Sequence, residues 1–426
     1  MKTRLNGTKD VLIHPLLLFT SVWLLCFVLY ALHLSRLLVF TTGEVGKVVC
    51  WIIAPFIVGF SVVHVLYAVS PKSKRRIKAT DNDEYLKKIE NKLDWWFRCW
   101  LVLSIVEIVF SGGFPLEWLF TGGSKDRTEF GLPIIHVFMV TLLSVLALTK
   151  FGLYLLRGDR RRLFIPFFQI LWSVVVISRD MMIVALLQSI ALLIFLKGVN
   201  IKMVRWLLIV SVATIVLFGY VGDLRQGDDS YFRDLALPSA NYPEWLPSGV
   251  LWAYIYITTP VGNLVNTSNL SKPSYNILFP NTIHNMFPGA IRNALYGKDS
   301  GLGMGGDLVY GPFNVSTAYV GPFMDYGYVG IICFSLLIGI ISSYFWRKRR
   351  QFKYKLLYSI TVQCLALSIF WNFLFDTSFL GQLVWIYILF RQRPFGVLPG
   401  KEALPAPVLM TKQLNGGEED CAAPIS

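Results

Sequence analysis

The amino-acid sequence predicts an all-α polytopic membrane protein with about ten transmembrane helices. The 426 residues are 54% hydrophobic and only 15% charged, and the mean hydropathy is +0.55. A soluble domain has about a quarter of its residues charged, so this composition excludes an ordinary soluble protein. The apolar residues also form runs long enough to cross a membrane, instead of alternating with polar residues as the strands of an outer-membrane barrel do.

The apolar runs set the predicted organisation, because a spanning helix needs about 20 residues. The predicted spans are residues 12–34, 47–69, 95–112, 132–155, 163–178, 180–197, 203–220, 318–345, 355–375 and 377–391. Seven helices then occupy residues 1–220 and three occupy residues 318–393. A long outer loop at 221–317 forms a separate, partly helical subdomain, and residues 394–426 form a cytoplasmic tail.

The Lys and Arg residues give a net charge of +14 and gather at every second junction between predicted helices. By the positive-inside rule these junctions and both termini face the cytoplasm, so loops 35–46, 113–131 and 221–317 and the turn Ser178–Asp180 face outside. This placement favours a membrane and argues against a nucleic-acid partner. The basic clusters comprise Lys2, Arg4 and Lys9; Lys72, Lys74, Arg75, Arg76 and Lys78; Arg157 and Arg160–Arg162; Arg347–Arg350; and Arg391 and Arg393.

One apolar stretch of the outer loop, from Val250 to Val265, resembles an eleventh span. If it crossed the membrane, every later segment would invert and Arg347–Arg350 would face outside, against the positive-inside rule. Pro260 lies within it and two asparagines lie near its end. The sequence therefore predicts a surface or re-entrant helix here.

The sequence has no signature of a metal site or of a nucleotide cofactor. The histidines are scattered, no cysteine lies in a predicted outer loop, and no Cys-x-x-Cys or His-x-x-x-His spacing occurs. The glycine-rich segment Gly301–Gly306 lacks the following Gly-Lys-Ser/Thr of a phosphate-binding loop. We therefore expect neither a metal nor a cofactor.

The outer loop 221–317 is too long to serve only as a connection between two helices. It is rich in aromatic residues, so we expect it to fold over the helix bundle rather than stay disordered. Its acidic residues outnumber its basic ones, so individual arginines rather than a basic patch would bind an anion. Arginine suits bidentate phosphate binding, and outside the membrane a lipid diphosphate is the expected anionic ligand.

Four segments resemble those of the Wzy-type O-antigen polymerases, the bacterial oligosaccharide repeat-unit polymerase family. They are Gly112-Gly-Phe-Pro-Leu116, Glu129-Phe-Gly-Leu-Pro-Ile-Ile-His136, Thr258-Thr-Pro-Val-Gly-Asn-Leu264 and the segment from Asn314 to Gly330, which includes Met-Asp-Tyr-Gly. Each motif is short, but their order and their placement on the outer side are shared with the family. The resemblance runs from the second or third predicted helix to the ninth.

The resemblance implies a multi-pass glycosyltransferase of GT-C-like architecture in the bacterial inner membrane, acting in lipopolysaccharide biosynthesis on the periplasmic face. It would transfer a glycan from undecaprenyl diphosphate onto another lipid-linked repeat unit, and a Wzz-type co-polymerase would control chain length. Two alternatives remain open. One is the related O-antigen ligase, and the other is a lipid-linked oligosaccharide flippase or other transporter, which is disfavoured because few charged residues occur within the spans.

Two arginines are candidates for binding the diphosphate. Arg225 lies five residues beyond the seventh predicted span, where a diphosphate at the membrane surface would lie; the alternative is a snorkelling interfacial arginine. Arg179 lies in the tight turn Ile-Ser-Arg-Asp, which resembles the arginine-bearing turn of such polymerases and ligases. Its alternative role is a simple ion pair with Asp180.

His284 and Arg292 are further catalytic candidates, because they share a predicted helical stretch from Thr282 to Leu295 and a spacing that puts them on one face. His284 would accept a proton from the acceptor hydroxyl or contact the diphosphate, unless its role is structural.

The remaining candidates lie near the outer ends of spans. Glu107 is either the catalytic base or a buried partner for Arg179 or Arg225. Asp325 is either a substrate-binding residue or a carboxylate that favours the N-terminus of the eighth span. Tyr310 and Tyr319 are expected to line the glycan groove through their aromatic faces.

Overall fold

A computed structural model describes residues 11–69, 83–121, 125, 129–199, 202, 205, 206, 209, 231–243, 245–297, 302 and 305–391. Within these residues every regular element is an α-helix or a 3-10 helix, and the one β-type pairing is an isolated bridge between Ser35 and Pro238. The predicted all-α class is therefore confirmed. The seventh predicted span, 203–220, falls almost wholly outside the described residues.

Five helical segments of the described chain are long and apolar enough to cross a membrane, as a helical membrane protein requires. Helix α3 and the short α4 together form one of the five. The elements are α2 (Thr42–Val69), α3 (Asp83–Ser111) with α4 (Pro115–Thr121), α5 (Ile135–Arg157), α7 (Arg179–Lys197) and α13 (Val320–Lys348).

Four further helices overlap predicted spans but are shorter. Two of them, α1 (Pro15–Ala31) and α15 (Thr377–Phe390), are apolar. The other two, α6 (Phe164–Val175) and α14 (Phe352–Ala366), are about 18 and 22 Å long at ~1.5 Å per residue. This is less than the ~30 Å hydrocarbon core, so the count of ten crossings stays a prediction.

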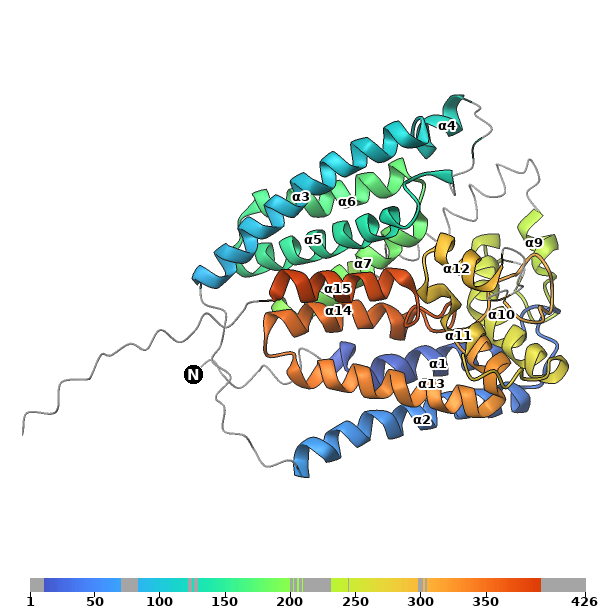
Figure 1. Cartoon of the computed structure of the whole chain (residues 1–426). Helices are drawn as coiled ribbons and strands as arrows, with labels where there is room; N and C mark the ends of the chain where they lie inside the picture. Colours follow the sequence, from blue (N-terminus) through green and yellow to red (C-terminus); the bar gives the residue numbers. More distant parts are fainter. Residues whose placement is uncertain are drawn as a thin grey trace, which may run out of the picture. The chain divides into compact units, whose positions relative to one another are not determined.

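The outer loop forms several helices at one end of the bundle (Figure 1). The longest, α10, contains the stretch from Val250 to Val265, which was predicted as a surface or re-entrant helix. It packs against the helices α1, α2 and α13 and is not among the segments suited to cross a membrane. The loop helices are α9 (Tyr231–Ala236), α10 (Ser248–Leu270), α11 (Pro280–Ile283) and α12 (Gly289–Tyr296), with the 3-10 helix η4 (His284–Met286) between α11 and α12.

Helices α2 and α13 pack closely because glycines let their backbones meet. A Cβ atom added at Gly59 would lie 2.3 Å from the carbonyl oxygen of Leu336, and one added at Gly339 would lie 2.4 Å from that of Phe56. Small residues allow such close approach in membrane bundles, where lipid provides no hydrophobic drive between helices. This contact fixes α13, whose outer end forms one wall of the candidate site.

Polar contacts join the other helices inside the bundle. The amide nitrogen of Gln188 in α7 donates to the side-chain oxygens of Gln363 in α14 (2.5 Å) and Gln382 in α15 (2.8 Å), and all three residues are buried. Helix α5 packs against α3, α6, α7 and α15 and is the most deeply buried of the candidate spans. The bonds from Gln188 therefore hold both α14 and α15 against α7.

Segments that were predicted on the same side of the membrane meet in the structure. The N–H of Arg36 donates to the carbonyl of Leu237 (2.8 Å), and the N–H of Ser239 donates to the carbonyl of Leu34 (3.0 Å). These bonds join the loop after α1 to the segment before α10. Both segments belong to the outer set in the charge-based prediction.

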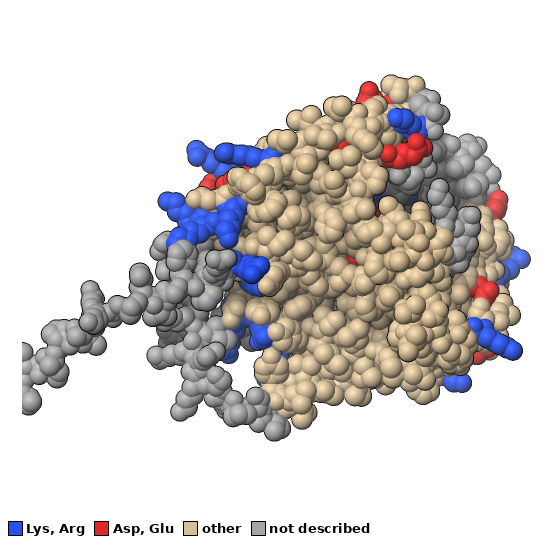
Figure 2. Space-filling model, viewed as in Figure 1, with Lys and Arg blue, Asp and Glu red and all other residues tan. Residues whose placement is uncertain are grey.

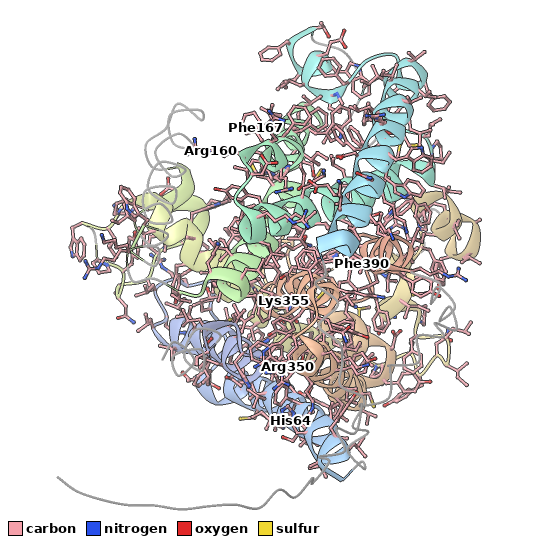
Figure 3. The ribbon with its side chains drawn as sticks, turned by 90° about the vertical axis from the view of Figure 1, so that its left-hand side faces the viewer. His64, Arg160, Phe167, Arg350, Lys355 and Phe390 are labelled. Carbon is pink, nitrogen blue, oxygen red and sulfur yellow. The ribbon has the colours of Figure 1, made fainter. Side chains whose placement is uncertain are left out.

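Charged side chains also gather at the two ends of the bundle. Figure 2 shows mostly Lys and Arg at one end of the face in view, a broad middle band almost without charge, and mixed acidic and basic residues at the other end. Seen from the basic end, Arg160, Arg350 and Lys355 lie on that surface (Figure 3). Among the described residues, the basic clusters at 157–162 and 347–350, both predicted to face the cytoplasm, thus lie at the same end, as a chain that crosses a bilayer requires.

Candidate functional site

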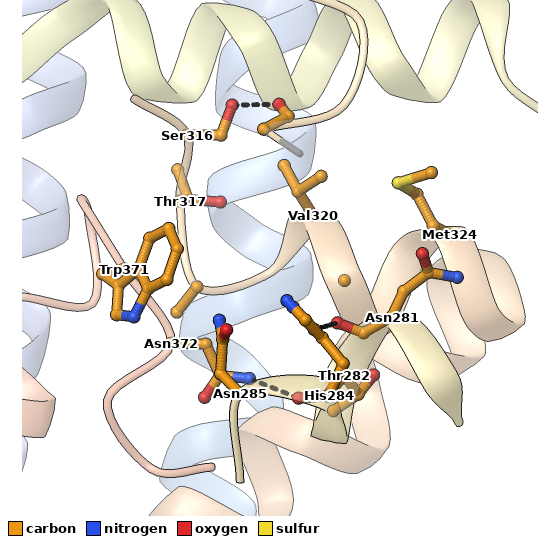
Figure 4. Close-up of a pocket in the computed structure, with 13 residues that line it drawn as sticks. Asn281, Thr282, His284, Asn285, Ser316, Thr317, Val320, Met324, Trp371 and Asn372 are labelled. Atoms are coloured by element: carbon orange, nitrogen blue, oxygen red, sulfur yellow. Dashed lines mark hydrogen bonds between the residues drawn. The ribbon is translucent and has the colours of Figure 1, made fainter. Parts of the chain in front are cut away.

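A pocket of about 40 Å³ opens at the end of the bundle that carries the loop helices. Such a volume holds about three waters at ~10–15 Å³ each, or one hydroxyl-bearing edge of a larger ligand. Figure 4 shows side chains from α11, η4, the start of α13 and the loop between α14 and α15 around it. Its polar lining comprises Asn281, Thr282, His284, Asn285, Ser316, Thr317 and Asn372, and Trp371 adds an aromatic ring.

The pocket lining is uncharged apart from what its histidine can carry. Amide and hydroxyl groups both donate and accept hydrogen bonds, so they suit a neutral ligand rich in hydroxyl groups. Two bonds hold the walls together. The amide of Asn372 donates to the carbonyl of Thr282 (3.1 Å), and the hydroxyl of Thr377 donates to the carbonyl of Asn285 (2.7 Å).

Asp325 fixes the position of α11. Its carboxylate is fully buried and accepts from the N–H groups of Asn281 (3.0 Å) and Thr282 (2.8 Å), and from their side chains at 2.8 and 2.6 Å. These N–H groups begin α11 directly after Pro280, whose nitrogen carries no hydrogen, and Phe279 before it offers no side-chain cap. The dipole that Asp325 stabilises is therefore that of α11, in the outer loop, rather than that of its own helix.

A break in α13 follows directly after Asp325. Tyr326 and Gly327 have non-helical backbone angles, and the φ of +61° at Gly327 favours glycine. The break frees backbone carbonyls, and the N–H groups of Ser274 and Tyr275 donate to those of Met324 (2.8 Å) and Asp325 (2.9 Å). The loop between α10 and α11 is thus tied to the outer part of a candidate membrane helix, with its buried backbone groups paired.

His284 presents one ring nitrogen to the pocket. The imidazole is buried, and its Nδ1 lies 3.2 Å from the carbonyl oxygen of Asn281, so we assign the proton to Nδ1. Burial lowers the pKa of His284 below its ordinary value, and the positive charge of Arg292 lowers it as well. A neutral ring with this tautomer has its lone pair on Nε2, which points into the pocket in Figure 4.

Arg292 lies beside this histidine, although the single predicted helix from Thr282 to Leu295 is wrong. The chain forms α11, η4 and α12 instead, because Phe287 precedes Pro288 and takes the extended conformation that a following proline favours. Arg292 in α12 is half-buried, and its Nη1 donates to the Oδ1 of Asn285 (3.2 Å). The two candidates are therefore brought together by a turn rather than by helical spacing.

Glu107 is buried, and among the described residues its charge-bearing partner is a histidine, whereas the alternative partner Arg225 lies outside them. Its Oε1 accepts from the N–H of Leu132 (3.1 Å) and lies 3.2 Å from Nδ1 of His136, the last residue of the second quoted motif. Neither Arg179 nor any other described arginine makes an ion pair with it. This corrects the predicted pairing with Arg179, and the contact joins α3 to the start of α5.

The other predicted residues lie apart from the pocket. Arg179 and Asp180 are exposed at the start of α7, and the described chain shows no ion pair between them. Tyr319 is fully buried, where its hydroxyl accepts from Ser335 (2.9 Å), so it is a core residue and not part of a groove. Tyr310 packs its ring against Phe313.

Arg225 lies outside the described residues, and the sequence reasoning also missed part of the site. Trp371 and Asn372 were assigned to the span 355–375, yet α14 ends at Ala366 and a loop follows. Polar residues near the end of that run, Ser368, Asn372 and Asp376, were the available signal. The asparagines of α11 and η4 could not be identified as site residues from the sequence, because asparagine is common in loops.

Comparisons of the chain with models of known protein families, with characterised proteins and with solved structures find no match.

Proposed function

We propose that the chain is a membrane glycosyltransferase of GT-C-like architecture with ten transmembrane helices, acting as an O-antigen repeat-unit polymerase on the periplasmic face of the bacterial inner membrane. The observation that carries this proposal is the free ring nitrogen of His284, which faces a pocket of amide and hydroxyl groups with Arg292 beside it. Hydroxyl-rich ligands such as sugars match that lining, and Trp371 offers a ring for an apolar sugar face.

The chemistry follows from these groups. Nε2 of His284 accepts the proton of an acceptor hydroxyl, whose oxygen forms a bond to the anomeric carbon of the donor glycan. The bond between that carbon and the diphosphate oxygen breaks, and undecaprenyl diphosphate leaves with the electron pair. Arg292 and Arg225 neutralise the charge that develops on the leaving group. The diphosphate link is itself the activated bond, so no nucleotide cofactor is needed.

The lowered pKa of His284 fits the role of a base, because the ring must be neutral to take up a proton. The hydrogen bond to Asn281 keeps the tautomer that leaves Nε2 unprotonated. Asp325 holds Asn281 in turn, so a buried carboxylate of the membrane helix would set the position of the base without contacting substrate.

The test is the lipopolysaccharide banding pattern of cells that lack the gene and carry a plasmid copy. Wild type should restore a ladder of repeat units, and His284→Ala should leave core with a single repeat unit at normal membrane levels of the protein. The matched control is His64→Gln, which changes a histidine near the basic end of the bundle (Figure 3) and should restore the ladder. Arg225→Ala tests the second arginine in the same way.

Other banding patterns select other functions. Core with no repeat unit, together with accumulated lipid-linked polymer, would identify a ligase. Core with no repeat unit and no such polymer would indicate a flippase. A full ladder from His284→Ala would leave the enzyme class standing and remove His284 as the base. A ladder of altered length in cells lacking a Wzz-type protein would support that partner.

A further inference from the structure

The segment of the outer loop directly before α11, residues 275–279, carries hydrophobic side chains on its surface. We call it the apolar turn. Four of its five side chains are large, hydrophobic and between 42% and 79% exposed, namely Tyr275, Ile277, Leu278 and Phe279. The sequence contains no Asp, Glu, Lys or Arg between Lys272 and Arg292. A contiguous exposed group of this kind marks an interaction surface, whereas single exposed apolar residues do not.

Two of these side chains occupy the corner of a tight turn. The N–H of Phe279 donates to the carbonyl of Asn276 (3.0 Å), which places Ile277 and Leu278 at the two corner positions. The side-chain Oδ1 of Asn276 also accepts from the N–H of Leu278 (3.0 Å). Corner positions usually carry Gly, Pro, Asn, Asp or Ser, because these residues suit the turn backbone. An isoleucine and a leucine at such a corner are therefore not explained by turn formation itself.

The base of the apolar turn is fixed on α13. The N–H of Tyr275 donates to the carbonyl of Asp325 (2.9 Å), and the rings of Tyr275 and Phe279 lie 6.0 and 4.8 Å from the ring centroid of Tyr326. Tyr275 and Phe279 have φ angles of +51° and +49°, which are unfavourable for residues with large side chains. The contacts with α13 therefore hold a strained backbone that keeps the corner residues exposed.

The surface of α13 next to this contact is expected to face lipid. Exposed apolar residues recur along the helix at spacings of three or four, which places them on one face. They are Val329, Cys333, Leu337 and Ile340. Helix α13 is one of the segments suited to cross a membrane, and Tyr326 lies three residues before Val329. The apolar turn thus lies at the outer end of the lipid-facing surface of α13.

We propose that the apolar turn inserts its corner into the outer leaflet of the bilayer around α13. The acyl chains cover Ile277 and Leu278, and Tyr275 lies at the membrane–water interface, where tyrosine is enriched. Asn281, which lines the pocket, lies two residues after Phe279, so the inserted turn keeps the pocket near the level of the lipid headgroups. This inference concerns a lipid-binding surface and does not depend on the proposed function.

The test places the purified full-length protein in phosphatidylcholine liposomes that contain phosphatidylcholine with a photoreactive diazirine in its acyl chain. Peptide mass spectrometry locates the cross-links. A second turn of the outer loop is the matched control, because the N–H of Tyr242 donates to the carbonyl of Ser239 (3.1 Å) and the exposed corner carries Ala240 and Asn241.

Cross-links at Ile277 and Leu278 should exceed those at the control corner by at least about tenfold, since transfer of one such side chain from water to lipid is favoured by about that factor or more. Val329 should also be cross-linked, because it belongs to the lipid-facing surface of α13. Equal cross-linking of the two turns, or no cross-link at Val329, would overturn the proposal.

Variants test the corner residues directly. Ile277→Ser/Leu278→Ser should reduce cross-linking of the apolar turn to the level of the control turn and leave the cross-links at Val329 unchanged, which shows that the protein is still folded in the bilayer. Asn241→Ser should change neither. Two other results would assign the surface to another occupant and overturn the proposal. One is cross-linking of Ile277 and Leu278 to a second copy of the chain, and the other is lipid cross-linking that needs an added polyprenyl phosphate.

Discussion

Thr282 meets the carboxylate of Asp325 with two donors, its N–H at 2.8 Å and its hydroxyl at 2.6 Å. The two residues are 43 positions apart in sequence, one in the outer loop and the other in a candidate membrane helix. Because Asp325 is fully buried, its charge is stabilised by these donors and by those of Asn281. The contact therefore fixes the position of the segment that carries His284 relative to α13.

Asp325→Asn should destabilise the protein by about 2–3 kcal/mol, because charge-assisted bonds are lost and the new NH₂ group faces the donors of Thr282 and Asn281. Thermal unfolding in detergent measures the change. Asp180→Asn serves as the control, since Asp180 is exposed in the first turn of α7, and should cost less than about 1 kcal/mol. Equal midpoints for the two variants would mean that the Asp325 contacts do not contribute to stability.

Gly327→Ala should loosen the outer loop. A φ of +61° is unfavourable for alanine, and relief of that strain would move the carbonyls that accept from Ser274 and Tyr275. Hydrogen exchange of these two amides should become faster, with a loss of about 1–3 kcal/mol in protection. Gly311→Ala is the control, because a Cβ atom there meets nothing within 4 Å. Unchanged exchange in Gly327→Ala would contradict the proposed tie between loop and helix.

The sequence allowed the helical class, the gathering of described loops at two ends of the bundle and several helix ends to be predicted, because these depend on hydropathy and on the placement of Lys and Arg. The end of α14 at Ala366 was not predictable in this way, since apolar residues such as Phe370 and Phe373 continue into the loop. The partners of Glu107 and Asp325 were missed because they depend on tertiary contacts. His284 and Arg292 were correctly predicted to lie close together, but the single helix that was predicted to carry both is not formed.

His284 should make the stability of the protein depend on pH. Its pKa in the folded state is below the ordinary value of 6.5, chiefly through burial and also through Arg292, although the hydrogen bond to the carbonyl of Asn281 and, less strongly, the charges of Asp325 and Asp376 raise it. The unfolded state therefore binds more protons at low pH. The stability contributed by neutral His284 should be complete above about pH 6.5 and should be lost as the pH falls through the lower folded-state value.

Unfolding midpoints measured between pH 5 and 8 test this expectation, with wild type compared to His284→Gln. The decrease below about pH 6.5 should be smaller in the variant, because glutamine does not titrate. Arg292→Gln gives a second readout, since removing the positive charge should raise the pKa of His284 towards its unfolded-state value and make the decrease below about pH 6.5 smaller. The same pH profile in all three proteins would exclude His284 as its source.

Glu107 and His136 should be energetically coupled, because the buried carboxylate accepts from the ring and from the N–H of Leu132. His136→Ala leaves a buried charge with one fewer donor and should cost about 2–3 kcal/mol. Glu107→Gln should cost less, since an amide oxygen still accepts from Leu132 and a neutral imidazole can change its tautomer to accept from the amide. The double variant Glu107→Gln/His136→Ala should then lose less stability than the sum of the single changes. Unfolding free energies of the four proteins give the coupling, and strict additivity would show that the pair is not coupled. The same variants separate the two roles that the sequence left open for Glu107. If Glu107 is a structural partner, Glu107→Gln should lower the amount of folded protein, and the ladder of repeat units should decrease in proportion. If Glu107 is the catalytic base, Glu107→Gln should abolish the ladder at normal protein levels.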